Sequence, residues 1–132
     1  MNCVSLPEVN IPESVTEIDT YSFYNCKSLI SINIPDKVKA LYGYTFSNCT
    51  SLQEVTFGEN FKSYRENEFN NTYYLNEVYF KSETPPVHYN NKSETLFDCL
   101  DVNVNIYVPE NSVEVYRESP AFANFVEKIT GY

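Results

Sequence analysis

The chain has 132 residues, the size of one domain, and 42% of them are hydrophobic. Its 9 Lys and Arg residues against 18 Asp and Glu residues give a net charge of −9, which is unsuited to binding the phosphate backbone of nucleic acids. No apolar run approaches the roughly 18 residues of a membrane span. With 1 His and 4 Cys, the chain also has few residues from which a familiar catalytic centre could be assembled.

A repeat of 23 residues runs through most of the chain. Cys3, Cys26 and Cys49 mark it, because each lies 23 residues after the one before. Periods between about 20 and 50 residues are typical of repeat proteins. The apolar positions keep the same spacing, in columns that include Leu6, Leu29, Leu52 and Leu75; Val9, Ile32, Val55 and Val78; and Phe23, Phe46 and Phe69. The cysteine column is preceded by residues suited to tight, left-handed bends, namely Asn2, Asn25, Asn48 and Asn71.

The cysteines are predicted to be stacked core residues. Equivalent residues of neighbouring coils lie about 4.8 Å apart. That exceeds the usual Cβ separation of about 3.5–4.5 Å in a disulfide, so a bridge within the column needs distortion. The absence of a CxxC pair gives no support to a zinc site, and the pattern implies no metal and no cofactor. Cys99 lies outside the period and is expected to be either buried or free.

Each repeat contains one clear strand pattern. Ile32 and Ile34 are two residues apart and should share a face, and Pro35 ends the strand because it cannot donate to a ladder. A second extended segment is expected at 38–41, and Phe46 anchors the return of the chain. One such coil cannot bury its own apolar edge, so stacked coils must share a continuous core.

The repeat resembles the BspA-type leucine-rich repeat. Residues 11–35, IPESVTEIDTYSFYNCKSLISINIP, carry the family's pattern of Ile-Pro, then Phe-x-x-Cys-x-x-Leu, then Ile-x-Ile-Pro. The resemblance implies an α/β-type repeat solenoid, a right-handed leucine-rich-repeat superhelix of strand-rich coils with short C-terminal capping helices. The family usually has Ala before the Phe. This chain has Ser22, Thr45 and Glu68 there, a departure expected to affect packing.

The chain is expected to divide into repeats at 1–83, the first of them partial, and a tail at 84–132. The tail would hold an irregular loop, a last repeat strand at 106–109 and a C-terminal cap. Residues 81–96 are interpreted as a loop because of their Pro and Asn pairs. Short helices are predicted after Asn111-Ser112 and at Ser119-Pro120. The second of them would carry an apolar face made of Phe122, Phe125 and Ile129.

The N-terminal residues 2–12 hold only the second half of a repeat, with no cap or signal peptide before them. Either the chain is part of a longer solenoid, or it is a short natural protein whose first coil meets a partner. An uncapped coil end exposes apolar side chains and a strand edge, and it could support a homo-oligomer.

The residues that alternate with the core positions are predicted to form a polar sheet face about 20 Å long. Solenoids commonly bind partners on such a surface, although it could also serve only for solubility. The best anchors on it are Tyr79 and Tyr107, because interfaces favour aromatic side chains. The two predicted columns are Glu8, Ser31, Glu54, Glu77 and Asn105, and Asn10, Asn33, Thr56, Tyr79 and Tyr107.

The chain is predicted not to be an enzyme. His88 is expected to be an exposed loop residue, and a Cys99–His88 nucleophile pair has no local signature to support it. No phosphate-binding loop, dinucleotide fingerprint, EF-hand or zinc-protease motif is present.

The family resemblance implies a surface-exposed or secreted protein of a host-associated bacterium, with a role in adhesion. The first hypothesis is therefore a non-enzymatic adhesion module that recognises a host protein or glycan through the strand face, with no nucleic acid as partner. The alternative is a structural spacer or capping segment of a longer surface protein, with no ligand of its own.

Overall fold

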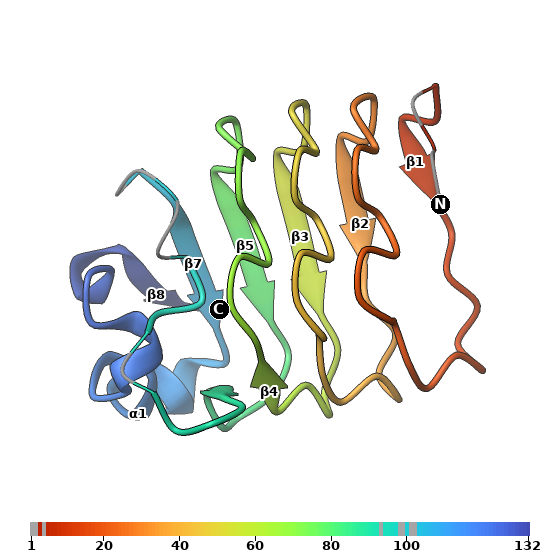
Figure 1. Cartoon of the computed structure of the whole chain (residues 1–132). Helices are drawn as coiled ribbons and strands as arrows, with labels where there is room; N and C mark the ends of the chain where they lie inside the picture. The colour runs from red at the N-terminus through yellow and green to blue at the C-terminus, as the bar shows by residue number, and fades with distance from the viewer. Residues whose placement is uncertain (1–2, 4, 93, 98–99, 101–102) are drawn as a thin grey trace.

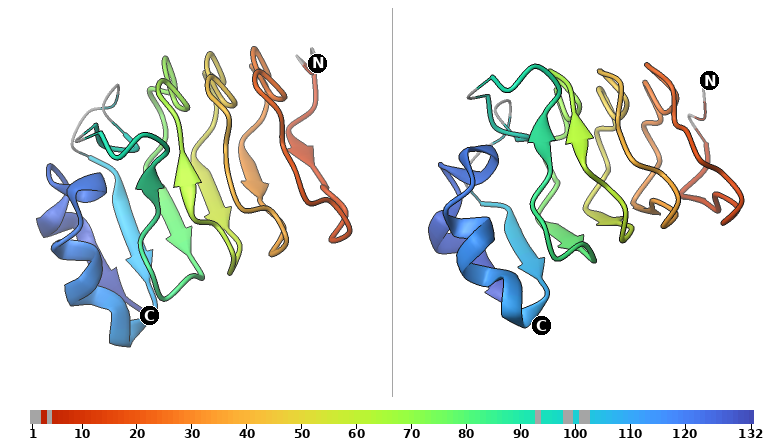
Figure 2. Two further views of the ribbon diagram at one scale, coloured as in Figure 1. Left: turned by 60° about the horizontal axis from the view of Figure 1, so that its bottom comes forward. Right: turned by 90° about the horizontal axis from the view of Figure 1, so that it is seen from below.

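The computed structural model describes residues 3, 5–92, 94–97, 100 and 103–132. Six parallel strands form one sheet in the order β1-β2-β3-β5-β7-β8, and successive coils lie side by side along it (Figure 1). The two termini lie at opposite ends of the stack (Figure 2). The predicted right-handed, strand-rich solenoid is confirmed. The six strands are β1 Glu8–Val9, β2 Ser31–Asn33, β3 Glu54–Phe57, β5 Glu77–Phe80, β7 Asn105–Val108 and β8 Ile129–Gly131.

The strand register follows the sequence period. Val55 of β3 pairs with Ile32 on one side and with Val78 on the other. Val78 in turn pairs with Ile106, although the connection between them is longer than one repeat. The additional residues are therefore accommodated outside the sheet, and the columns predicted from the sequence stay in register up to β7.

A second, shorter ladder runs along another side of the coils. Here β4, Ser63–Tyr64, pairs in parallel with β6, Val87–His88. Isolated bridges continue the ladder into earlier coils, joining Ile18 to Leu41 and Ala40 to Ser63. The extended segment predicted at 38–41 is thus confirmed at Ala40 and Leu41. The interpretation of 81–96 as a loop is wrong at β6, because those two residues complete the ladder that β4 would otherwise leave open.

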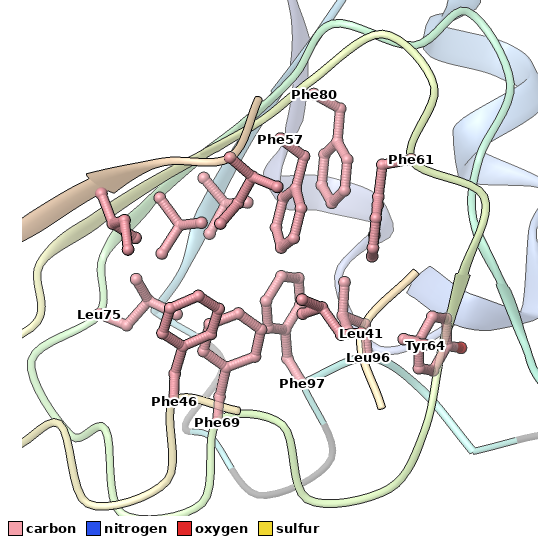
Figure 3. Close-up of a cluster of buried hydrophobic side chains, with 14 of the residues drawn as sticks. Leu41, Phe46, Phe57, Phe61, Tyr64, Phe69, Leu75, Phe80, Leu96 and Phe97 are labelled. Atoms are coloured by element: carbon pink, nitrogen blue, oxygen red, sulfur yellow. The ribbon is translucent and has the colours of Figure 1, made fainter. Parts of the chain in front are cut away.

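Stacked aromatic rings fill the space between the two ladders. Phe46 lies between Phe23 and Phe69 of the neighbouring coils, with ring centroids 5.5 and 5.4 Å apart. Phe57 and Phe80 stack in the same way at 5.0 Å, and Figure 3 shows the two rows facing each other. Equivalent residues one coil apart are brought to about 4.8 Å by the ladder, which is close to a stacking distance. The repeat therefore uses Phe columns as its core.

The coil corners depend on left-handed backbone. The predicted Asn corners are confirmed at Asn25, Asn48 and Asn71, with φ of 62°, 62° and 61°. A second left-handed column, which the sequence pattern did not predict, consists of Tyr21, Tyr44 and Asn67 with φ of 61°, 55° and 59°. Such angles are uncommon for a bulky residue. The rings of Tyr21 and Tyr44 stack at 5.1 Å, so the strained corners also contact each other across coils.

The cysteine column differs from its prediction. Cys3 and Cys26 form a disulfide, with Cα atoms 4.7 Å apart, within the range that a bridge can span. The prediction assumed parallel side chains, whereas these two lean toward each other. Cys49 is free and buried, and its Sγ donates to the carbonyl oxygen of Phe23 at 3.0 Å. Cys99 lies outside the described residues.

The C-terminal cap begins as predicted. A 3₁₀ turn, η1 Glu110–Ser112, leads into helix α1, Val113–Arg117. A second 3₁₀ turn, η2 Pro120–Phe122, begins at Ser119, whose Oγ accepts a hydrogen bond from the Ala121 N–H at 3.3 Å. The predicted cap residue before a proline is therefore confirmed.

The rest of the cap differs from its prediction. Phe122, Phe125 and Ile129 are buried, as expected of an apolar face, but they do not lie on one helix. A third 3₁₀ turn, η3 Val126–Lys128, separates them, and Ile129 begins strand β8. Ile129 pairs with Ile106, so β8 covers the edge that β7 would otherwise expose.

We expect Gly58→Ala to lower the free energy of unfolding by about 2 kcal/mol, the middle of the range for overpacked sites. A Cβ at this position would lie 2.6 Å from both the Cα of Asp36 and the carbonyl oxygen of Pro35, and this backbone cannot move without disturbing the coil. Urea unfolding measures the loss. Glu59→Ala, at the exposed neighbouring position, is the control, and equal stabilities of the two variants would contradict the close approach.

Thiol counting tests the cysteine arrangement. Burial raises the pKa of Cys49 to about 12, so a Cys99→Ser variant should show no thiol reactive toward Ellman's reagent in the native state at about pH 8. Concentrated guanidinium chloride should expose Cys49 alone, and reduction should then release Cys3 and Cys26 as well. Three thiols before reduction would show that the disulfide is absent.

Candidate functional site

The outward surface of the six-stranded sheet, here called the strand face, carries the predicted candidate residues. The first column pairs in register from Glu8 through Ser31, Glu54 and Glu77 to Asn105. The second pairs from Asn33 through Thr56 and Tyr79 to Tyr107, and β8 extends it to Thr130. Asn10 lies just beyond the paired residues of β1. Each of these side chains is exposed or half-buried, so the structure brings the predicted residues onto one accessible surface.

A tyrosine cluster, made of Tyr79, Tyr107 and Tyr132, occupies the C-terminal half of this face. Tyr79 and Tyr107 stack with centroids 4.6 Å apart and planes 16° apart. Tyr132 packs edge-on against Tyr79 at 6.3 Å, and its hydroxyl donates to the Phe80 carbonyl at 2.8 Å. Sequence reasoning missed Tyr132, because nothing in the repeat pattern indicates that the side chain following β8 reaches past β7 to β5.

The charges of the strand face have one sign. Its three charged members are Glu8, Glu54 and Glu77, all in one column. Partial burial and the nearby Glu77 and Glu54 carboxylates raise the pKa of Tyr79, whose hydroxyl lies 3.4 Å from Glu77 Oε2. The Tyr79 hydroxyl therefore keeps its proton at neutral pH, and the cluster presents aromatic rings beside negative charge.

His88 is not the exposed loop residue that the sequence predicted. It is 3% exposed, because β6 places it beside Tyr64 with the rings edge-to-face at 5.6 Å. Its Nδ1 accepts a hydrogen bond from the Asn90 N–H at 3.3 Å, so Nε2 carries the proton of the neutral ring. That nitrogen lies 3.5 Å from Glu94 Oε2 and 3.8 Å from Glu66 Oε2.

His88 links separate segments of the chain. Its ring is held by the ladder and by the 88–91 turn, and Nε2 faces carboxylates from two separate segments. Cys99, the other member of the nucleophile pair that the sequence did not support, lies outside the described residues. In the part of the chain that the structure describes, no group of three or more His, Cys, Asp or Glu residues is arranged to hold a metal ion.

A cavity of about 470 Å³ is lined in part by Glu66 and Glu94, and the buried Glu68 carboxylate also forms part of its wall. Glu68 is 1% exposed and accepts backbone N–H bonds from Gly43, Thr45 and Arg65 at 2.9, 3.2 and 3.0 Å. Glu68 was expected from the sequence to affect packing, and it also links two coils by hydrogen bonds that an Ala side chain could not make. Burial raises the pKa of Glu68, and the backbone donors oppose this increase only in part.

Glu68 should make the stability depend on pH. Its folded-state pKa lies above its ordinary value of 4.5, so the folded protein binds the proton more tightly than the unfolded chain. The free energy of unfolding of the native protein, minus that of Glu68→Gln, should therefore fall as the pH rises from about 4.5 through the raised pKa. Urea unfolding across this window measures it. Glu59→Gln corrects for the loss of one charge, and a rising difference would contradict the assignment.

Comparisons with known proteins agree with the architecture. A family model described as a BspA type leucine-rich repeat region matches residues 1–91 in six copies. A crystal structure of a leucine-rich cell surface protein from Faecalibacterium prausnitzii superimposes with a TM-score of 0.60 at 24% identity. The match covers 95% of this chain and 31% of that one, so it shows a shared fold over about a third of the larger protein. No curated protein matches the chain.

None of the helices in the described ranges is long and apolar enough to cross a bilayer.

Proposed function

We propose that this chain, which belongs to the BspA-type leucine-rich-repeat family, is a non-enzymatic module that binds a protein at the cell surface through its strand face. Repeats of this family support a role as an interaction or structural module. The specific proposal is that the chain has a ligand of its own and that the tyrosine cluster anchors it.

The tyrosine cluster is the observation that carries this proposal. Tyr79 and Tyr107 lie on the outward surface of neighbouring strands and are half-buried. Stacked rings held by neighbouring strands are rigid, so a partner can bury aromatic area with little loss of side-chain freedom. Aromatic side chains at the centre of a surface are common binding hot spots.

Location at the surface or secretion is part of the same proposal. Two comparisons support it: the family match, and the fold shared with a protein described as a cell surface protein. The Cys3–Cys26 disulfide is also typical of oxidising compartments outside the cytosol.

We expect Tyr79→Ala with Tyr107→Ala to weaken partner binding tenfold or more, because two anchor rings would be removed from one surface. The measurement is binding of the purified protein to an array of extracellular proteins and glycans, followed by titration of each ligand found. The matched control is Tyr73→Ala with Tyr74→Ala, which removes two rings that are 71% and 68% exposed and lie outside the strand face.

The outcomes separate the hypotheses. If the ligands bind the Tyr79 and Tyr107 variant as tightly as the native protein, the strand face is the wrong surface. If the control variant loses binding equally, the effect is not specific to the cluster. If the native protein binds none of the array, the spacer hypothesis is favoured. Circular dichroism and thermal melting confirm that each variant is folded.

A further inference from the structure

We propose that the occupant of the strand face is an extended, arginine-bearing segment of a partner protein, an inference that rests on the function proposed above. The segment would place guanidinium groups against the tyrosine cluster and beside the Glu54 and Glu77 carboxylates. Three features of the structure lead to this partner chemistry: the sign of the charge, the geometry of the rings, and the way this chain binds one of its own arginines.

The charge of the face selects a cationic partner. The strand face carries the three carboxylates of Glu8, Glu54 and Glu77 and no Lys or Arg, within a chain of net charge −9. Lys81 follows directly after β5 and its charge acts on the Tyr132 hydroxyl, but its Nζ also lies 3.6 Å from Asp36, whose carboxylate offsets that charge. Glu54 and Glu77 are direct partners on neighbouring strands, about 4.8 Å apart, so a single bound cation can lie near both.

The ring geometry favours a flat cation. The rings of Tyr79 and Tyr107 are nearly parallel and cover each other on one side. On the other side of Tyr79 the paired residue is Thr56, which is small, and Glu54 lies two residues away on the same face of β3. A guanidinium is planar and stacks on aromatic rings, whereas an ammonium is a compact, strongly hydrated charge. Arginine therefore fits this site better than lysine.

The protein already uses tyrosine rings to bind a guanidinium. The Arg65 guanidinium carbon lies 4.2 Å from the ring centroid of Tyr89 and 5.5 Å from that of Tyr42. This internal contact joins residues from three coils. The strand face also presents tyrosine rings, here stacked on each other and beside carboxylates, with no cation–π contact from an arginine in the described residues.

A matched pair of peptides tests the proposal. The probes are a synthetic ten-residue peptide that alternates Arg with Thr and its counterpart with Gln in place of each Arg, and calorimetry measures their binding. We expect the Arg peptide to bind at least tenfold more tightly than the Gln peptide, and a Lys version to bind between them. Raising the salt from about 0.05 to 0.3 M should weaken the Arg peptide several-fold.

Variants then locate the binding site. Glu54→Gln with Glu77→Gln, and separately Tyr79→Ala with Tyr107→Ala, should each weaken the Arg peptide about tenfold. Glu118→Gln with Glu127→Gln changes the net charge by the same amount at exposed positions of the cap, and it should leave binding within twofold.

Two results would overturn the proposal. One is equal binding of the Arg and Gln peptides, and the other is equal weakening by the cap variant, which would mean general attraction to an acidic protein. The proposed function fails on different evidence. If the array yields a ligand that depends on the tyrosine cluster but carries no basic segment, such as a neutral glycan, the binding function stands and only the arginine partner is wrong.

Discussion

A coil of this protein can bury its apolar side chains only against the coils beside it, and the parallel ladders fix the distance between them. The same spacing of about 4.8 Å that satisfies the backbone also brings Phe23, Phe46 and Phe69 into one stack. The core residues, the corner residues and the surface residues are therefore each arranged in columns that run from one coil to the next. A change at one position acts on the next coil, as Gly58 shows by lying against the backbone at Asp36.

The ends and irregular parts of the stack need other solutions. At one end the Cys3–Cys26 disulfide ties the first described coil to the second. At the other, β8 pairs with β7 and the short helices cover the core. Between the two ends, Glu68 accepts hydrogen bonds from backbone N–H groups of two coils, and His88 extends the second, shorter ladder formed by β4 and β6. Each of these devices deals with a polar group or an edge that the repeat alone leaves open.

The strand face follows from the same constraint. In-register pairing aligns every outward position, so three glutamates share one column, and Tyr79 and Tyr107 become a stacked pair. The repeat thereby turns a sequence pattern into a surface with a defined charge and a defined aromatic site. The division of the chain at residues 83 and 84 stays a prediction, as does the binding role of each strand-face residue.

The sequence by itself determined the solenoid, its core columns and the outward residues, because in-register stacking depends only on the period and on the alternation of apolar positions. It also located the Asn corners and the Ser119 cap, which are local preferences. Only the tertiary structure decided that Cys3 and Cys26 are bonded, that Glu68 and His88 are buried, and that Ile129 belongs to a strand. It also placed Tyr132 against Tyr79. In each of these cases the residue contacts a partner that is distant in sequence or belongs to another coil. The local sequence pattern does not show which polar groups or strand edges such a partner must pair with or cover.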